Sequence, residues 1–140
     1  MAGDYPHAIE LYTRSIEACP TAEAYTFRGW SRSFLGDYGR AIADCLEAIK
    51  VDPDFGNPYN DIGAYLIEQG KWDESIPWFH KAMEAPRYEA RPYPHFNLGR
   101  VYEHRNDWQR AKECYARAYA LDRGYVAALA GIRRLRAALN

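Results

Sequence analysis

The sequence predicts an all-α protein built as a solenoid of antiparallel helix pairs. Apolar residues recur at three- and four-residue spacing in every periodic segment and alternate in none, which indicates amphipathic helices with one buried face each. The chain also repeats itself, because Gly29, Gly63 and Gly99 stand 34 and 36 residues apart. Two further columns keep the same steps: Tyr38, Trp72 and Trp108, and Ala48, Ala82 and Ala118. Such a period is typical of stacked helical repeats.

Residues 59–85 show the repeating unit most clearly. A first helix with an apolar stripe ends at Gly70, and a second helix begins near Trp72 with a matching stripe, so the two stripes can close on one another. We expect the helices to come closest at Gly63, where a larger side chain would push the backbones apart. Pro77 falls inside the second helix and is expected to bend it. The stripes consist of Tyr59, Ile62, Gly63 and Leu66, then of Ile76, Phe79, Ala82 and Met83.

The whole chain is expected to form one domain, residues 1–140, with an incomplete unit at its start. A lone helix over residues 4–18 ends at Pro20 and matches the second helix of a unit. The segment 85–92 is the one stretch with loop composition beyond a tight turn. The predicted units are a half-repeat at 4–21, full repeats at 22–55, 56–91 and 92–125, and a capping helix at 126–140.

The half-repeat lacks the helix that would cover one side of it. Its inner stripe is apolar, so part of this strip is expected to stay available for contact. We therefore predict a weak homodimer through the N-terminal helix. The strip consists of Tyr5, Ile9, Tyr12 and Ile16.

The repeated residues resemble the tetratricopeptide repeat, and the resemblance covers nearly the whole chain. It implies a right-handed superhelix in which the first helix of each pair lines a concave groove that binds other proteins. The residues that carry the resemblance are Tyr25-x2-Arg28-Gly29, Ala41-x3-Cys45 and Pro53, then His95-x2-Leu98-Gly99-x2-Tyr102 and Ala111-x3-Tyr115.

Through this resemblance, the stripe away from the glycine column is expected to face the groove and to bind a peptide or a partner helix. Trp30 and Tyr93 would be aromatic anchors, and Asn60 and Asn97 would pair with the backbone of an extended peptide. The alternative is that the aromatic residues only pack on neighbouring helices. Glu23, Thr26, Ser33 and Ala64 share the stripe with the predicted partner-binding residues, which are Trp30, Asn57, Asn60, Asp61, Tyr93, Phe96, Asn97, Arg100 and Arg134.

A subset of the family grips the C-terminal carboxylates of a peptide with lysine, arginine and asparagine side chains. We do not expect that activity here, because the carboxylates of such a ligand would be buried without cationic partners. The comparable places in this chain hold Thr26, Trp30, Asp61, Tyr93 and Asn97.

A narrower resemblance covers the second half of the chain, from Asn60 to Arg123. This part resembles the bacterial lipoproteins that help to assemble the secretin rings of type IV pili. The resemblance implies an alternative function in pilus or secretin assembly, in the periplasm or on the inner face of the outer membrane. That alternative requires an export signal and a lipidated cysteine upstream of Met1.

Composition and motifs favour a non-catalytic protein that uses no cofactor and no metal. The formal net charge is −1, with 18 basic and 19 acidic residues, which argues against nucleic acid as a partner. No run of apolar residues predicts membrane insertion, and Asp4 and Glu10 stand where a signal peptide would be basic and then apolar, so we expect a cytoplasmic protein. The three cysteines and four histidines lack metal-binding spacing. Glu103 and His104 are adjacent and point apart on a helix, so they do not indicate acid–base catalysis.

Overall fold

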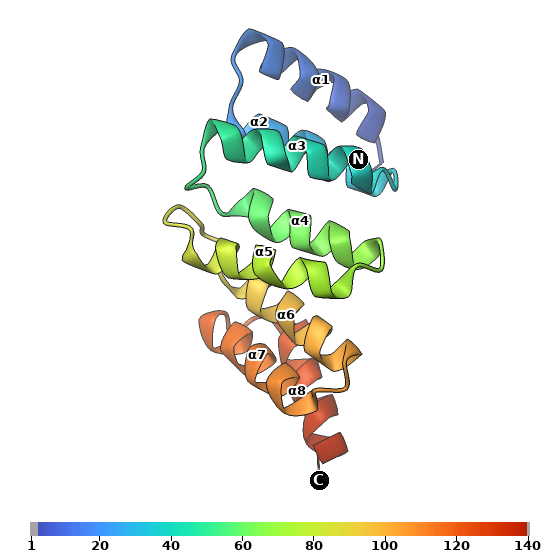
Figure 1. Cartoon of the computed structure of the whole chain (residues 1–140), viewed down its shortest axis with the longest axis vertical. Helices are drawn as coiled ribbons and strands as arrows, with labels where there is room; N and C mark the ends of the chain where they lie inside the picture. Colours follow the sequence, from blue (N-terminus) through green and yellow to red (C-terminus); the bar gives the residue numbers. More distant parts are fainter. Residues whose placement is uncertain (1–2, 140) are drawn as a thin grey trace.

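The computed structural model describes residues 3–139, and within that range it contains eight α-helices that stack in chain order from the N-terminal to the C-terminal end (Figure 1). The predicted all-α class is confirmed. The helices are α1 (Tyr5–Ala18), α2 (Ala22–Phe34), α3 (Tyr38–Val51), α4 (Asn57–Glu68), α5 (Trp72–Glu84), α6 (Pro92–His104), α7 (Trp108–Leu121) and α8 (Val126–Leu139).

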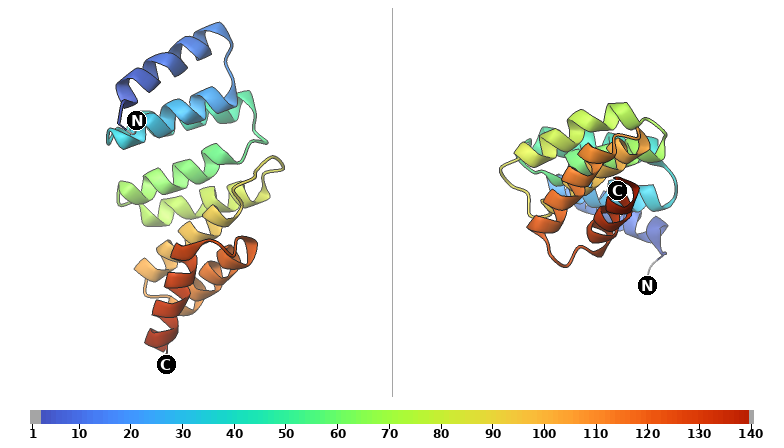
Figure 2. Two further views of the ribbon diagram at one scale, coloured as in Figure 1. Left: turned by 180° about the vertical axis from the view of Figure 1, so that it is seen from behind. Right: turned by 90° about the horizontal axis from the view of Figure 1, so that it is seen from below.

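The helices pack as antiparallel pairs, α2 with α3, α4 with α5 and α6 with α7, and each pair packs on the next through α3 with α4 and α5 with α6. Helix α1 lies on α2 at one end, and α8 lies on α7 at the other. Figure 2 shows the same stack from behind and along its length, where the later helices are turned relative to the earlier ones. This arrangement confirms the helical-repeat solenoid.

The turn inside each pair uses the same backbone conformation. Gly36, Gly70 and Asn106 occupy equivalent positions and have φ of 77°, 78° and 60°, a left-handed conformation that ends a helix. The next residue then donates its N–H back to a carbonyl of the last turn, as Lys71 does to Leu66 at 2.8 Å. Glycine adopts this conformation without strain and asparagine tolerates it, which explains the residue types found there.

The glycine column marks the close approach of paired helices, as expected. A Cβ built on Gly63 would lie 2.4 Å from the ring of Phe79, and one on Gly99 would lie 2.5 Å from the ring of Tyr115. Phe79 is fully buried and Tyr115 is 1% exposed. Each aromatic ring therefore fills the space that the glycine leaves, which ties the two helices of a pair at a fixed distance.

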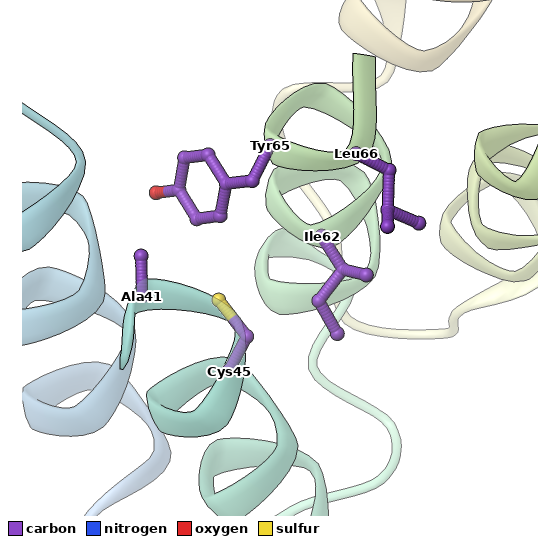
Figure 3. Close-up of a cluster of buried hydrophobic side chains, with 5 residues drawn as sticks. All are labelled: Ala41, Cys45, Ile62, Tyr65 and Leu66. Carbon is purple, nitrogen blue, oxygen red and sulfur yellow. The ribbon is translucent and has the colours of Figure 1, made fainter. Parts of the chain in front are cut away.

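Between pairs, the core is made of smaller side chains. Figure 3 shows Ala41 and Cys45 of α3 on the side of α4 towards which the Tyr65 ring extends, whereas Leu66 points to the opposite side of α4 and Ile62 lies between. Cys45 is fully buried, and burial raises the pKa of its thiol well above the usual value, so it acts as a small apolar residue.

Pro77, which was expected to bend its helix, lies inside α5, and that helix continues as one element from Trp72 to Glu84. The Pro77 side chain is exposed. A carbonyl that loses its helical donor on the solvent side stays open to water, so the helix tolerates the proline.

The N-terminal helix is anchored on α2 more firmly than the sequence indicated. Ile16 is only 9% exposed, and Tyr5 stacks on Phe34 with ring centroids 4.6 Å apart. Leu11 is the exposed apolar residue of this helix, at 49%. The strip predicted to stay available is therefore partly covered within the chain itself.

Candidate partner-binding groove

Three adjoining pockets follow one another along the stack, and together they are called the groove here. The first pocket lies between α2, α4 and the start of α6, the second between α6 and α8, and the third runs on between α6 and α8 towards the turn before α7. Their volumes are about 230, 580 and 480 Å³. Asn60 and Tyr93 line both the first and the second pocket, and Phe96 lines both the second and the third, so the pockets share walls.

All nine residues predicted to bind a partner line this groove. The first pocket contains Trp30, Asn57, Asn60, Asp61 and Tyr93, the second adds Phe96 and Asn97, and the third adds Arg100 and Arg134. Thr26 also lines the first pocket, but it is 3% exposed and its hydroxyl donates to the Ala22 carbonyl. Glu23, Ser33 and Ala64, predicted on the same stripe, do not line the three pockets.

The groove aromatics differ in how much surface they leave open. Trp30 and Tyr93 are each 49% exposed. Phe96 is half-buried, because its ring packs against both Tyr115 and Tyr125, with centroids 5.4 and 5.0 Å away. Trp30 and Tyr93 pack edge-on against Phe34 and Tyr125, with centroids 4.6 and 5.6 Å away, and still leave about half of their surface accessible.

The two groove asparagines bind each other. The Asn97 side-chain amide donates to the Asn60 side-chain oxygen at 3.1 Å, and both residues are buried. The side-chain oxygen of Asn97 accepts a hydrogen bond from the Arg100 guanidinium at 3.1 Å. These side chains hold α4 and α6 in register, so pairing with a peptide backbone would first require this pair to open.

The two groove arginines are also engaged. Arg134 forms two hydrogen bonds with Glu103, at 2.7 and 2.9 Å, and Tyr115 donates to the same carboxylate at 2.8 Å. The contact with Arg134 lowers the pKa of Glu103, with a further contribution from Tyr115. Arg100 lies 3.8 Å from Glu68. His104, the neighbour of Glu103, instead stacks on Trp72 with centroids 4.0 Å apart.

Comparison with known proteins identifies the repeats. Residues 54–124 and residues 22–55 each match a family model described as tetratricopeptide repeat. The chain belongs to the tetratricopeptide repeat family. This tetratricopeptide repeat chain is 36% identical over 84 residues to small glutamine-rich tetratricopeptide repeat-containing protein 2 of Mycosarcoma maydis, which is 59% of the chain and 24% of that relative. It is 34% identical over 85 residues to heat shock protein STI1 of Saccharomyces cerevisiae, which is 59% of the chain and 14% of STI1. The chain thus spans a quarter or less of the length of these relatives.

Solved structures show the same fold. PilF of Pseudomonas aeruginosa superposes with a TM-score of 0.87 at 21% identity, over 95% of this chain and 60% of PilF. The first tetratricopeptide repeat domain of Spaghetti (RPAP3), solved with the HSP90 peptide SRMEEVD, gives a TM-score of 0.76 at 18% identity, over 85% of this chain and 93% of that one. At these identities the likeness is one of fold.

The loop after the second full repeat completes the tetratricopeptide groove. Tyr88 is 5% exposed and lies against Gly56, where an added Cβ would come within 2.5 Å of it. Arg87 exchanges backbone hydrogen bonds with the turn after α3, and its guanidinium lies over the Phe55 ring at 4.2 Å. Figure 1 shows this loop beside the turn between α3 and α4. Tyr88 and Ala90 thereby become a wall of the first pocket.

Sequence reasoning missed several of the residues that line the groove. Phe27, 45% exposed, stands beside the predicted stripe, and Tyr88 comes from a loop whose path has no repeat counterpart. Asp122 and Tyr125 belong to the turn before α8 and line the second pocket. Phe27 could have been found by widening the stripe by one residue, whereas the path of a loop without a counterpart has no sequence signal.

Metal binding and membrane crossing are two further properties on which residues 3–139 bear. No group of three or more histidine, cysteine, aspartate or glutamate residues within this range is arranged to hold a metal ion. None of the helices in the described part is both long enough and apolar enough to cross a membrane.

Proposed function

We propose that this chain is a non-catalytic interaction scaffold that binds a peptide or a helix of another protein in its groove. The single observation that carries the proposal is a pair of half-exposed aromatic side chains, Trp30 and Tyr93, which come from the first helices of the first and third full repeats and line the same pocket. Large, partly exposed aromatic side chains in a recess are the residues that most often dominate the energy of an interface. Relatives named as tetratricopeptide repeat proteins, and a related fold solved with a bound peptide, support the same reading.

A display library of random short peptides tests the proposal. Selected peptides are resynthesised and their affinity for the intact chain is compared with that for Trp30→Ala and Tyr93→Ala. Each substitution is expected to weaken binding by about 1–3 kcal/mol, because each removes one buried anchor, while circular dichroism stays unchanged. Trp108→Ala is the matched control, since Trp108 is 39% exposed and does not line the groove. Normal affinity in both groove variants would refute the proposal.

The alternative function, in pilus or secretin assembly, makes a different prediction. It requires an apolar export segment and a cysteine encoded upstream of Met1 in the natural gene. Reading that stretch of the genome tests the alternative directly. The likeness to PilF is one of fold, so it does not distinguish the alternative function from a peptide-binding scaffold.

A further inference from the structure

The first pocket has the dimensions and the walls of a receptor for a single side chain. Its volume of about 230 Å³ is below the ~300–1,000 Å³ typical of sites for drug-sized ligands. Four aromatic residues line it: Phe27 and Trp30 from α2, Tyr88 from the loop and Tyr93 from α6. Three of them, all except Tyr88, are 45–49% exposed, so each keeps accessible surface, although Phe27 also stacks on Tyr12 with ring centroids 5.8 Å apart.

Asp61 is the only ionisable carboxylate among the residues that line this pocket, and no basic residue lines it. The side chain is half-buried, and burial raises its pKa to about 7, with only partial compensation from the Asn60 amide. A carboxylate withdrawn from water without a cationic partner is unfavourable in its charged form.

The arginines of α2 and of the loop have other partners. Arg91 donates to the backbone carbonyls of Met83, Ala85 and Pro86, and three others bind carboxylates. Arg28 and Arg32 both bind Asp44, at 2.7 and 2.8 Å. Arg87 binds Asp52 at 2.7 Å and Glu23 at 3.5 Å. Among the ion pairs of the described residues, none involves Asp61. A cation brought by a partner would therefore meet an Asp61 carboxyl that no ion pair of the described residues occupies.

We propose that the first pocket binds one basic side chain, a lysine or an arginine, of the partner peptide, with its cationic group on Asp61 and its stem against the aromatic walls. A cation is attracted to the faces of tryptophan and tyrosine, and a charge-assisted bond to a carboxylate adds to that attraction. The apolar stem of either side chain packs well against aromatic rings while the charged head reaches a polar group. This inference rests on the proposed function and specifies the chemistry of the bound segment.

An acidic ligand does not fit the same pocket. A carboxylate placed there would meet Asp61 at short range, and like charges in a partly desolvated site repel each other. The second pocket continues this pattern, because Asp122 is its one charged residue. The cations of the groove, Arg100 and Arg134, lie in the third pocket and are held by Glu68 and Glu103. The chemistry of this groove thus differs from one that receives an acidic peptide tail.

The test uses peptides selected on the intact chain from the random display library. The selected sequences are expected to share a lysine or an arginine. Replacing that residue with methionine, which keeps the length and removes the charge, should weaken binding to the intact chain by about ten-fold or more. When binding is measured to Asp61→Asn, the methionine replacement in the peptide should change the affinity by a much smaller factor. In that variant the basic side chain of the peptide no longer has a carboxylate to bind.

Glu89→Gln is the matched control, since it removes one negative charge from an exposed side chain beside Tyr88 that does not line the pocket. This variant should discriminate between the two peptides as the intact chain does. The affinities of the original peptide and of its methionine variant are both measured on the intact chain. This comparison therefore tests the need for a basic side chain even if Asp61→Asn fails to fold.

Two results overturn the inference while leaving the proposed function in place. One is a set of bound peptides without a shared basic residue, or with a shared acidic one. The other is an equal loss on methionine replacement for the intact chain and for a folded Asp61→Asn. If no peptide of any composition binds, the proposed function falls as well, and this inference with it.

Discussion

Asp61 stands out at the scale of single residues because its position costs the protein stability near neutral pH. Burial raises its pKa to about 7, from an ordinary value of 3.8. Between these values the folded chain holds a proton that the unfolded chain has released. Folding is therefore favoured below about pH 4, and this contribution to stability is lost as the pH rises through about 7. The other ionisable groups around it are Tyr65, Tyr88, the Cys45 thiol and Asp44 with its two arginines.

We predict that Asp61→Asn raises the free energy of unfolding at pH 8 by on the order of 1–3 kcal/mol, because the amide is not charged and the partial exposure of the site screens the original penalty. At pH 4 the two proteins should be nearly equally stable. Urea unfolding at both pH values measures this difference. Glu89→Gln should show no such gain at pH 8. A variant less stable than the parent at pH 8 would show that the Asp61 carboxylate is stabilised in the free protein.

At the scale of the helix pair, the glycine column sets the distance between partners. The helix α4 comes so close to α5 at Gly63 that only Phe79 fits between them, and Phe79 has no exposed surface into which it could move. Elsewhere in the chain a glycine can be free of such contact: Gly39, within α3, has nothing within 4 Å of an added Cβ. A substitution at Gly63 therefore reports on close packing together with helix propensity, whereas one at Gly39 reports on helix propensity alone.

We predict that Gly63→Ala lowers the free energy of unfolding by about 1–3 kcal/mol, because overpacking against Phe79 exceeds the ~1 kcal/mol gained from helix propensity. Gly39→Ala should do the reverse and raise it by about 0.5–1 kcal/mol. Thermal and urea unfolding of the two variants measures both changes. Adding Phe79→Leu to Gly63→Ala should recover part of the loss. If Gly63→Ala were as stabilising as Gly39→Ala, the close contact would not control this pair.

At the scale of the whole molecule, the two ends of the stack differ. Helix α8 covers the last pair with Ile132 and Leu135, which are buried, and turns Arg133 and Arg136 to solvent. Helix α1 has no such cover on its outer side, where Leu11 is exposed. A terminal element of a solenoid usually carries a polar outer face, and α1 meets this only in part, with Glu10 and Arg14 paired at 2.7 Å.

We predict weak self-association through α1, because pairing two such ends removes apolar surface from water. Sedimentation velocity over a range of concentrations should show an average mass that rises with concentration. Leu11→Lys should abolish the rise, because Leu11 is the large apolar side chain that α1 leaves exposed, whereas a change on the α8 surface, such as Arg136→Glu, should not. A monomer at every concentration would mean that contacts with α2 and the Glu10–Arg14 pair are sufficient cover.

Most of the fold could be predicted from the sequence, because in a repeat protein several columns of residues indicate the same spacing independently. The glycine column, the aromatic or alanine columns and the turn residues each gave the same spacing, so errors at any one position were corrected by the others. The groove was readable for the same reason, since equivalent positions on successive first helices must share a side of the stack. All nine predicted residues lie along it.

What the sequence did not contain was the pairing of these side chains. Asn60 and Asn97 stand 37 residues apart in the chain, and only the angle between α4 and α6 decides that they bond to each other. The same holds for Arg134 with Glu103 and for the buried Asp44 with its two arginines. The place of Tyr88 depends on a loop that has no counterpart in the other repeats. Such features follow from three-dimensional geometry rather than from periodicity.

The loop at residues 85–91 also has a mechanical consequence. In a stack where each unit contacts only its neighbours, small changes in the rotation between successive repeats add up along the axis. Arg87 links the loop to the first full repeat, because it binds Asp52 and Glu23, while Tyr88 packs against Gly56, Ala82 and Ala85. Both ion pairs are exposed, so salt weakens them. We therefore expect the link between this loop and the first full repeat to loosen as the ionic strength rises.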